Sequence, residues 1–524
     1  MCLALVPIVL LEPALRLFGF GNDLRLVILV APPNDKFTHQ FNELADRPFF
    51  GATDLGGPEP RRFALPKSPS VYRIVVLGES TVAGFPYPPE LAFPRQMEIL
   101  LRHQRPDEQI EVLNAGITAI NSHVIADLAE QALAAEPDLI IVHAGHNEFY
   151  GPGGVTSKFG RLPPPLLRLG FALRKTRIGQ LERLWSGADS GQELSEMLPA
   201  ELHIPLDSDA MRRAAAEFEA NLTRIVTTAR ANGVRVLLTT VASNVRDQSP
   251  IRAIHSRTLS ASDEQQWTKL FEDAEQSLAA GDAEQAFARL SEAAKIDEHH
   301  AQLLYRQGQC LAALGRDAEA TAKFELARDC DGCRFRAPSQ FCDVVRKVAE
   351  RNRVAGVHFA DWAGDVAASV APRALGADLF LEHVHYRLSG HYQLAAYLAE
   401  VVQTEIIGGE WNERRAVAFE ELREELRISA QDEIAARSLA LQVQQISPFA
   451  QALDAAKHER RLADEIRKLY LTLSPTDQAV FASLSMADMQ HNLPLALARD
   501  YDRAGDAASA KKWREIAGLR RPWE

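Results

Sequence analysis

Short apolar runs alternate with helix-patterned stretches through much of the chain. The first is a β-branched run that begins at Val71 and stops abruptly at Gly78-Glu79-Ser80. Similar runs follow at 110–116, 138–147, 234–241 and 356–361. Runs of this kind are typical of parallel strands that are buried on both faces. The pattern predicts an α/β fold of the flavodoxin-like three-layer type, with helices on both faces of a five-stranded parallel sheet in the order 2-1-3-4-5.

The stretch between the fourth and fifth predicted strands repeats its own pattern with a period of 34 residues. Gly281 corresponds to Gly315, and Ala286 corresponds to Ala320. The period and the small residues resemble tetratricopeptide repeats, in which paired helices stack against their neighbours. We therefore expect residues 261–334 to form an all-α insertion. Because two repeats are too few for an independent solenoid, these helices must lean on the rest of the protein or supply a short groove for a peptide or protein partner.

The chain after residue 408 is almost entirely helix-patterned. Near its end, Gly505, Ala510 and Ala517 repeat the spacing found in the insertion. We expect residues 409–524 to form helical hairpins next to the inserted helices, and both segments to make one surface that recognises a protein partner rather than taking part in chemistry. A scaffold that merely covers one face of the sheet is an equally good interpretation.

Apolar residues dominate the first 20 positions, where Glu12 and Arg16 are the only charged side chains. A second apolar run covers residues 24–31. We interpret residues 1–35 as an anchor-like segment, the exit end of a membrane anchor that leaves the remaining chain on the periplasmic, extracytoplasmic side. A buried N-terminal helix is the alternative.

Two other segments lack a clear periodicity. Lys36 to Pro69 is rich in Pro, Gly and Asn and is predicted to be an arm packed over the sheet. Gly153 to Asp207 carries Pro, Gly and Ser between helical patches, and long insertions at this edge of a sheet often build a substrate lid.

The predicted domain division is the apolar segment 1–35, an α/β domain in two parts at 36–260 and 335–408, the helical insertion 261–334 between them, and the C-terminal helical region 409–524.

Ser80 stands where the first predicted strand turns into a helix. A serine at such a turn exposes its hydroxyl at the carboxyl edge of the sheet, beside free backbone N–H groups of the following helix. These are the two requirements of a serine nucleophile. A serine that merely caps the helix is the alternative interpretation of the same position.

Gly116 and Asn147 follow the same placement rule as Ser80, since each comes after the carboxyl end of a predicted strand. In the order 2-1-3-4-5 the three strands are neighbours, so the three residues converge at the crevice outside the sheet edge. A nucleophile, a backbone N–H donor and a side-chain amide donor have the composition of an oxyanion hole beside a serine.

A histidine with a nearby acid completes the set. In LEHVHYRLSG, His385 lies three residues after Glu382, and a glycine follows five residues further on. The order Gly-x-Ser, Gly, Gly-x-Asn and acid-x-x-His resembles the SGNH (GDSL-type) hydrolase superfamily. This resemblance implies that Ser80 is the nucleophile and His385 the general base. It also implies that the Ser80 and Gly116 backbone N–H groups and the Asn147 side chain are the oxyanion donors.

Two departures from the family pattern concern acidic residues. The family usually has Asp where this chain has Glu79 and Glu382. We expect Glu79 to lie outside the chemistry, whereas the extra methylene of Glu382 changes the reach of the carboxylate that should orient His385. Asp361 and Asp378 are therefore alternative orienting acids. Whichever acid acts would fix the imidazole tautomer and stabilise the imidazolium that forms during attack.

The sequence segments around these motifs, such as GESTVAGFPYP and GHNEFYGP, resemble more specifically a bacterial branch of the superfamily in which this hydrolase fold carries tetratricopeptide repeats. The likeness to the superfamily covers residues 61–245 and 355–407. It implies a serine esterase or acyl hydrolase that works through an acyl-enzyme on an O-acyl ester, such as an O-acetyl ester, of a glycan or lipid. An acyltransferase that uses the same serine and a catalytically silent binding or scaffold protein are the competing function classes.

Composition excludes some function classes. The formal net charge of −12 argues against a general nucleic-acid binder, and the basic pairs at 61–62 and 460–461 are predicted to be solvated surface. Five cysteines suit neither a disulfide framework nor a metal centre, although Cys330 and Cys333 leave a local disulfide open. No cofactor or metal fingerprint stands out in the sequence.

Overall fold

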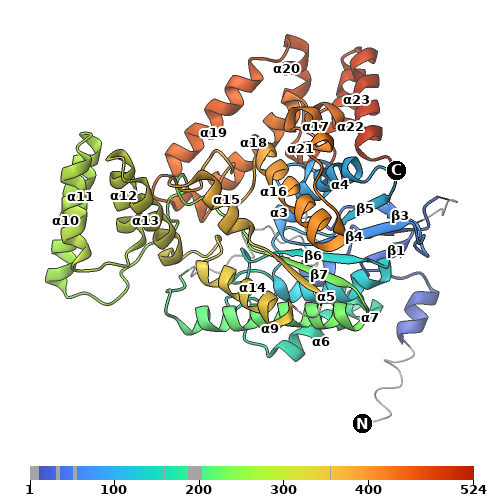
Figure 1. Ribbon diagram of the computed structural model, residues 1–524, viewed down its shortest axis with the longest axis horizontal. Helices are drawn as coiled ribbons and strands as arrows, with labels where there is room; N and C mark the ends of the chain where they lie inside the picture. Colours follow the sequence, from blue (N-terminus) through green and yellow to red (C-terminus); the bar gives the residue numbers. More distant parts are fainter. Residues whose placement is uncertain are drawn as a thin grey trace, which may run out of the picture.

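The computed structural model describes residues 11–30, 36–50, 56–157, 160–186, 203–353 and 356–523. Its centre is a five-stranded parallel sheet with the order β5-β4-β6-β7-β8 (Figure 1). Counted along the chain, this is the predicted order 2-1-3-4-5, so the prediction of one parallel sheet is confirmed. The strands are β4 (Val71–Gly78), β5 (Gln109–Asn114), β6 (Leu139–His143), β7 (Arg235–Thr239) and β8 (Val357–Ala360).

The register of the sheet brings the carboxyl ends of its strands to one edge. Gly78 at the end of β4 lies opposite His143 at the end of β6, and Thr239 of β7 lies opposite Ala360 of β8. A Cβ at position 78 would lie 2.2 Å from the backbone oxygen of His143, so only glycine fits this approach. The loops that leave the strand ends therefore meet on one side of the molecule.

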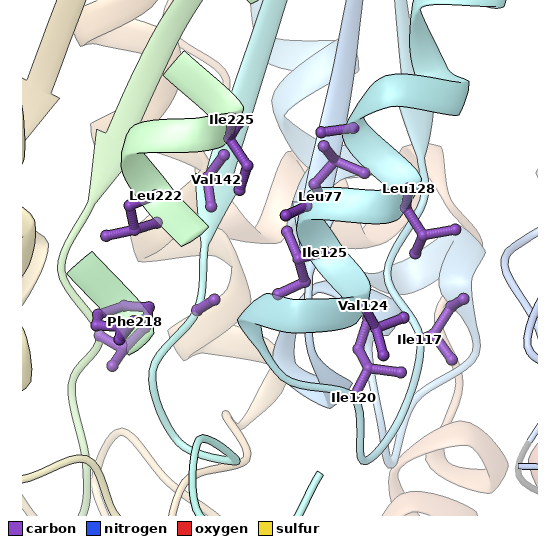
Figure 2. Close-up of a cluster of buried hydrophobic side chains, with 14 of the residues drawn as sticks. Leu77, Ile117, Ile120, Val124, Ile125, Leu128, Val142, Phe218, Leu222 and Ile225 are labelled. Carbon is purple, nitrogen blue, oxygen red and sulfur yellow. The ribbon is translucent and has the colours of Figure 1, made fainter. Parts of the chain in front are cut away.

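Three helices cover one face of the sheet, namely α5 (Ser122–Ala132), α9 (Asp209–Ala231) and α14 (Ser339–Asn352). Alternate strand residues point to opposite faces, and Leu77 of β4 and Val142 of β6 point to this one. Figure 2 shows part of this cluster, in which Ile125 of α5 and Leu222 of α9 lie beside the strand residues. The helices form here because their apolar residues recur at helical spacing and find a buried surface.

The opposite face of the sheet is covered by α4 (Phe93–Gln104) and α16 (Leu388–Val401). Ile74 and Val76 of β4 and Ile141 of β6 are fully buried against these helices. The sheet is therefore covered on both faces. The shorter elements of this part are η1 (Pro89–Leu91), η2 (Leu133–Ala135), α15 (Trp362–Val370), the π-helical η4 (Val402–Gly408) and η5 (Glu413–Arg415).

The N-terminal part of the chain builds a second sheet, which the sequence did not predict. Strands β1 (Val27–Leu29), β2 (His39–Phe41) and β3 (Arg62–Phe63) pair in antiparallel fashion, and α2 (Arg47–Phe50) follows β2. Strands this short show no visible alternation in a sequence. Phe41 and Phe63 pack edge to face with centroids 5.6 Å apart and join the core on the α5 side. The predicted arm is therefore a folded part of the core.

The described part of the predicted anchor segment is residues 11–30, of which 11–17 are helical. Leu24 and Leu26 are buried, and the second apolar run contains strand β1. That run is therefore part of the antiparallel sheet, and its assignment to an anchor was wrong. Within the described ranges, no helix is both long and apolar enough to cross a bilayer. Residues 1–10 and 31–35 lie outside the described residues.

Helices α6 (Pro164–Lys175) and α7 (Arg177–Ser186) belong to the segment predicted to be a lid. Phe171 of α6 packs edge-on against Phe49 of α2, with centroids 4.9 Å apart. The Gln180 side chain of α7 exchanges hydrogen bonds with the backbone of Asn22. These two helices therefore pack on the N-terminal segment, which does not support the lid prediction. Residues 158–159 and 187–202 of the same segment lie outside the described residues.

The insertion after β7 consists of two helix hairpins at one end of the molecule (Figure 1). Its helices are α10 (Ala261–Ala279), α11 (Ala283–Ala294), α12 (Ala301–Ala313) and α13 (Asp317–Cys330). Gly281 (φ +81°) and Gly315 (φ +74°) turn equivalent corners in the left-handed conformation that favours glycine. The 34-residue repeat is thus one hairpin, and the described part of the insertion is all-α as predicted. Its identity as tetratricopeptide repeats stays a prediction.

A hydrogen-bonded clasp closes the base of the insertion. The Asp331 carboxylate accepts from the backbone N–H groups of Ile251 and Arg252, each at 2.9 Å. The Gly332 N–H donates to the Arg252 carbonyl at 2.8 Å, and Arg336 pairs with Asp331 at 3.1 Å. The chain therefore leaves and re-enters the α/β part at one point, after which β8 pairs with β7 as expected.

The C-terminal helices form their own cluster, built largely from α18 and α20 to α23. In Figure 1, α22 and α23 lie at the end of the molecule opposite to α10 and α11. The insertion is contacted by Asp454, which pairs with Arg306 of α12 at 3.1 Å, and by Leu453, which packs on the cluster of α12 and α13. The two helical segments therefore meet near residues 453–454, and their joint role in recognition stays a prediction. The elements are α17 (Phe419–Glu425), α18 (Ala430–Gln445), η6 (Phe449–Gln451), α19 (Ala455–Tyr470), α20 (Pro475–Ala482), α21 (Met486–His491), α22 (Leu493–Arg503) and α23 (Ala507–Arg520).

The packing of the insertion can be tested at Gly308 in α12. A Cβ at this position would lie 2.8 Å from ring atoms of the buried Phe324 in α13. We expect Gly308→Ala to lower the free energy of unfolding by about 1 kcal/mol or more, because overpacking outweighs the gain in helix propensity. Gly170→Ala in α6 is the matched control, since a methyl group there meets nothing within 4 Å. Urea unfolding should show destabilisation for the first variant, and equal stability of both variants would contradict this packing.

Candidate active site

Ser80 is the first residue of the short helix α3 (Ser80–Ala83), directly after β4. Glu79 takes the N-cap position with extended backbone angles, so Ser80 does not cap the helix. A residue at the first helical position has a backbone N–H without an acceptor inside the helix. Ser80 therefore presents both its hydroxyl and its N–H at the carboxyl edge of the sheet, although its exposed fraction is only 7%.

A chain of two hydrogen bonds joins Ser80 to an acid. The Ser80 Oγ lies 2.7 Å from His385 Nε2, and His385 Nδ1 lies 2.6 Å from Glu382 Oε1. Glu382 Oε1 also accepts from the His385 backbone N–H at 2.8 Å, and the carboxylate is buried. If Nε2 is to accept the Ser80 proton, Nδ1 must carry the hydrogen that faces Glu382. The geometry matches that requirement.

The other two acids considered for orienting His385 are used elsewhere. Asp361 accepts from the Thr240 hydroxyl at 2.8 Å and pairs with Arg346 at 2.9 Å. Asp378 is exposed and pairs with Arg246 at 2.7 Å. Of the three candidates, the structure therefore brings Glu382 to His385.

His383 shares the Glu382 carboxylate with His385, because its Nδ1 contacts the second oxygen, Oε2. Holding both oxygens fixes the plane of a side chain that is one methylene longer than aspartate. These three residues are also the group of described side chains whose potential ligand atoms are close enough, within 4.8 Å, to hold a metal ion. The Nδ1 atoms of both imidazoles face the carboxylate, so each ring can donate an N–H to Glu382 and is oriented by it.

Gly116 lies close to the helix that begins at Ser80, but its N–H already has an acceptor. That N–H donates to Asn114 Oδ1 at 2.9 Å, and Asn114 Nδ2 donates to the Val82 carbonyl of α3 at 2.8 Å. A Cβ at position 116 would lie 2.3 Å from the backbone nitrogen of Ala83. Glycine is thus needed for the close approach of this loop to α3. As an oxyanion donor, Gly116 would first have to release Asn114, a residue that the sequence analysis did not single out.

Asn147 follows β6 and is half-buried. Its backbone N–H donates to Glu79 Oε1 at 3.1 Å, while its side-chain amide forms no hydrogen bond with the described part of the chain. The backbone of Asn147 is thus fixed, while its side-chain NH₂ group has no acceptor in the described part of the chain. This NH₂ group can therefore donate to a bound oxyanion. Of the two predicted partners of Ser80, Asn147 is therefore the one with a free donor.

Glu79 positions the loop that bears Asn147, and its place outside the chemistry stays a prediction. Its carboxylate accepts three successive backbone N–H groups, from Gly145 at 3.2 Å, His146 at 3.0 Å and Asn147 at 3.1 Å. Burial raises the pKa of Glu79 to about 7, against the opposing effect of these hydrogen bonds. The signal in the sequence was the acid next to Ser80, but the three donors become visible only when β4 and β6 are paired.

Several buried histidines surround the site, and burial lowers their pKa values. The pKa of His385 is lowered to about 3, and so is that of His143. His146 is buried too, and its Nδ1 accepts from the Ala337 backbone N–H at 3.1 Å. Desolvation penalises the charged imidazolium, so these rings are neutral near pH 7. A neutral His385 is the form that can accept a proton.

The C-terminal region forms part of the wall of the site. The Phe449 ring lies 4.5 Å from the His383 ring, between centroids, and Arg387 pairs with Glu465 of α19 at 2.7 Å. Arg461 donates to the Leu381 carbonyl at 2.6 Å, directly before Glu382 in the chain. The C-terminal helices therefore brace the segment that carries Glu382 and His385. The prediction that they serve recognition alone did not include this role.

Two other predictions from side-chain type can be compared with the structure. Arg61 was expected to be solvated but is buried, pairs with Glu98 at 2.5 Å and lies over the Trp523 ring at 4.2 Å. Cys330 and Cys333, like Cys310 and Cys342, are free thiols, so no local disulfide joins the pair. Neither feature contributes a group to the site around Ser80.

Comparisons with known proteins gave matches to solved structures alone. The chain is similar to a protein from Desulfitobacterium hafniense described as lipolytic and of the G-D-S-L family, with 10% identity and a TM-score of 0.29, covering 63% of this chain and 98% of that one. It is also similar to a lipase/acylhydrolase from Enterococcus faecalis, with 12% identity, a TM-score of 0.28, and coverage of 63% and 95%. A mutant acetyl-xylooligosaccharide esterase from Geobacillus matches with 14% identity, a TM-score of 0.29, and coverage of 65% and 97%. Protein-family profiles and curated protein sequences gave no match.

The role of Glu79 can be tested by Glu79→Gln. An amide presents one acceptor oxygen to three donors, and its NH₂ group opposes them, so the Asn147 loop should shift. If the site is catalytic, we expect kcat/KM for a small ester to fall on the order of 10- to 100-fold, as for a displaced oxyanion donor.

Glu148→Gln is the control for that variant. Glu148 is equally buried, and burial raises its pKa to about 8, so an amide replaces a carboxyl group that is already largely protonated near pH 7. Its side chain is hydrogen-bonded to the backbone N–H and the hydroxyl of Ser122 and, unlike Glu79, forms no hydrogen bond with the described backbone of residues 145–147. The kcat/KM of Glu148→Gln should stay near the wild-type value. If both variants lost the same activity, Glu79 would contribute only to packing and not to the position of the Asn147 loop.

Proposed function

We propose that the protein is a serine ester hydrolase in which Ser80 forms an acyl-enzyme. The observation that carries this proposal is the relay from Ser80 Oγ to His385 Nε2 (2.7 Å) and from His385 Nδ1 to Glu382 Oε1 (2.6 Å). A serine hydroxyl is a weak nucleophile until a base takes its proton, and a base needs a third group that fixes its tautomer. All three groups are in contact at the end of β4.

The steps follow from these contacts. Ser80 Oγ attacks the ester carbonyl carbon while its proton moves to His385 Nε2, and Glu382 stabilises the imidazolium. The Ser80 N–H and the Asn147 side-chain amide stabilise the oxyanion of the tetrahedral intermediate. His385 then returns the proton to the leaving alcohol, and the acyl group stays on Ser80. Water, deprotonated by His385, releases the acid in a second round.

The finer assignments belong to the same proposal. The resemblance to SGNH hydrolases of the tetratricopeptide-bearing bacterial branch favours an O-acyl ester, such as an O-acetyl ester, of a glycan or lipid. The apolar composition of the first 20 residues supports an extracytoplasmic location with membrane attachment at the N-terminus. The two inserted hairpins are proposed to bind a protein partner. The mechanism draws on protein side chains and water, and no step requires a cofactor.

An acyltransferase is the second candidate, because Ser80 and His385 are each only 7% exposed. Transfer requires the acyl-enzyme to be shielded from water until another hydroxyl attacks. The same three side chains would serve both reactions. Products formed with and without a carbohydrate acceptor distinguish the two, since a transferase yields an acylated carbohydrate. The hydrogen-bonded Ser80–His385 pair speaks against a catalytically silent binding protein.

The nucleophile and base can be tested with short p-nitrophenyl esters. Ser80→Ala should abolish release of p-nitrophenol, and His385→Ala should lower kcat by about 10²- to 10⁴-fold, the usual contribution of a general base. Ser208→Ala is the matched control, because Ser208 caps α9 and its loss costs stability but touches nothing in the site. If wild type and Ser80→Ala were equally inert towards a broad ester panel, a binding protein would be the better assignment.

The pH dependence of kcat/KM should separate the two ionising groups of the site. The neutral imidazole is the base, so a His385 pKa lowered by burial keeps it active well below the ordinary value of about 6.5. Glu79 has a raised pKa of about 7, and its carboxylate form holds the Asn147 loop. The rate should therefore fall partly as pH drops through 7 and fully only well below 6.5.

Glu79→Gln should remove the upper step of that profile and keep the lower one. Stopped-flow or steady-state rates across pH 4 to 9, with folding checked by circular dichroism, measure both steps. A single complete loss with a midpoint at 6.5, unchanged in Glu79→Gln, would mean that His385 titrates as an ordinary exposed histidine.

A further inference from the structure

Helix α6 is apolar on two opposite faces. Its inner face buries Leu167 and Phe171 against the rest of the protein. Its outer face carries Leu166, Leu169 and Leu173, whose spacing of three and four residues puts them on one side of the helix, and Leu162 lies two residues before the helix begins. These leucines are all exposed, to between 42% and 56%: Leu162, Leu166, Leu169 and Leu173. A single exposed leucine needs no explanation, but an ordered row does.

Large apolar side chains are also exposed on the neighbouring helical segments. Leu184 and Trp185 of α7 are 61% and 87% exposed, and Leu17 and Phe18 of the N-terminal helical segment are 84% and 85% exposed. The N-terminal segment is fixed to α7, since Glu12 accepts from the Ile178 N–H at 3.0 Å, in addition to the contacts of Gln180 with Asn22. We call the exposed apolar residues of 11–18, α6 and α7 the leucine face.

Basic residues accompany the leucine face. Residues 160–186 contain six basic side chains and a single acidic one, Glu182, in a chain whose net charge is −12. Arg161 and Arg168 each directly precede a leucine of the row, are exposed, and have no acidic partner within the described part of the chain. The surface is therefore both apolar and locally positive.

We propose that the leucine face docks on an anionic lipid bilayer. An amphipathic surface with leucine and tryptophan side chains beside arginines lies in the interface of a membrane, with its apolar side chains among the acyl chains and its cations at the lipid phosphates. In a two-fold dimer through this surface, the same locally positive patch of both copies would face itself, and the like charges would repel. The proposal does not depend on the hydrolase assignment.

The leucine face is joined directly to the loop that bears Asn147. Leu167 on the inner face of α6 packs on Gly153, where an added Cβ would lie 2.2 Å from its Cδ2. Gly153 follows Asn147 by six residues, and the intervening chain is ordered by turns such as Gly151 N–H to the Asn147 carbonyl at 2.9 Å. Docking through α6 therefore places this edge of the sheet close to the bilayer surface.

Vesicle binding of the full chain tests the proposal. Wild type should co-sediment with phosphatidylcholine vesicles that contain phosphatidylglycerol, and binding should weaken with added salt. The triple variant Leu166→Gln, Leu169→Gln, Leu173→Gln should bind at least about tenfold more weakly, because three apolar side chains no longer enter the bilayer. Arg168→Gln should weaken binding to the anionic vesicles and leave the residual binding to pure phosphatidylcholine unchanged.

The matched control replaces three exposed leucines of the C-terminal region, Leu471→Gln, Leu495→Gln and Leu519→Gln, whose exposed fractions of 67%, 42% and 45% bracket those of the α6 leucines. It should bind vesicles like wild type, and all variants should keep wild-type circular dichroism. Equal binding of wild type and the α6 triple variant, or no vesicle binding by wild type, would overturn the proposal. So would a wild-type dimer in light scattering that the α6 variant dissociates while neither protein binds vesicles, since the face would then belong to a second copy.

Discussion

The carboxylate of Glu79 ties the two halves of the candidate site together. It comes from the end of β4, one residue before Ser80, and it binds three consecutive N–H groups at the end of β6. These contacts exist because β4 and β6 are neighbours and end at the same level, which in turn requires glycine at position 78. Ser80 and the open amide of Asn147 are therefore positioned by the pairing of two strands rather than by either loop alone.

His385 reaches the same edge although it lies 305 residues after Ser80 in the chain, and several neighbouring residues hold it there. Glu382 fixes His385 while His383 fixes Glu382, and the C-terminal helices brace this segment through Arg461 and Phe449. The C-terminal helices, which follow the α/β part in the sequence, thus help to position the residues of the site. Burial by this shell also explains why the surrounding imidazoles are neutral.

The sequence predicted what depends on local pattern. Five apolar runs of ordinary strand length gave the parallel sheet and its order, and strand ends gave the positions of Ser80 and Asn147. The antiparallel sheet was missed because strands of two or three residues leave no periodicity and are stabilised by distant contacts such as Phe41 with Phe63. Asn114 accepts from the Gly116 N–H, and Glu79 accepts from the Asn147 N–H. Both contacts depend on which strands are neighbours, and this cannot be predicted from residue type alone.

The clasp at Asp331 has a consequence for how this architecture can vary. Because both ends of the insertion are fixed to each other, the pairing of β7 with β8 does not depend on the length of the chain between them. Closing a longer loop costs only about 0.6 kcal/mol for each doubling of its length. The base of the insertion is thus a point at which the length of the inserted chain can change with little effect on the pairing of β7 with β8.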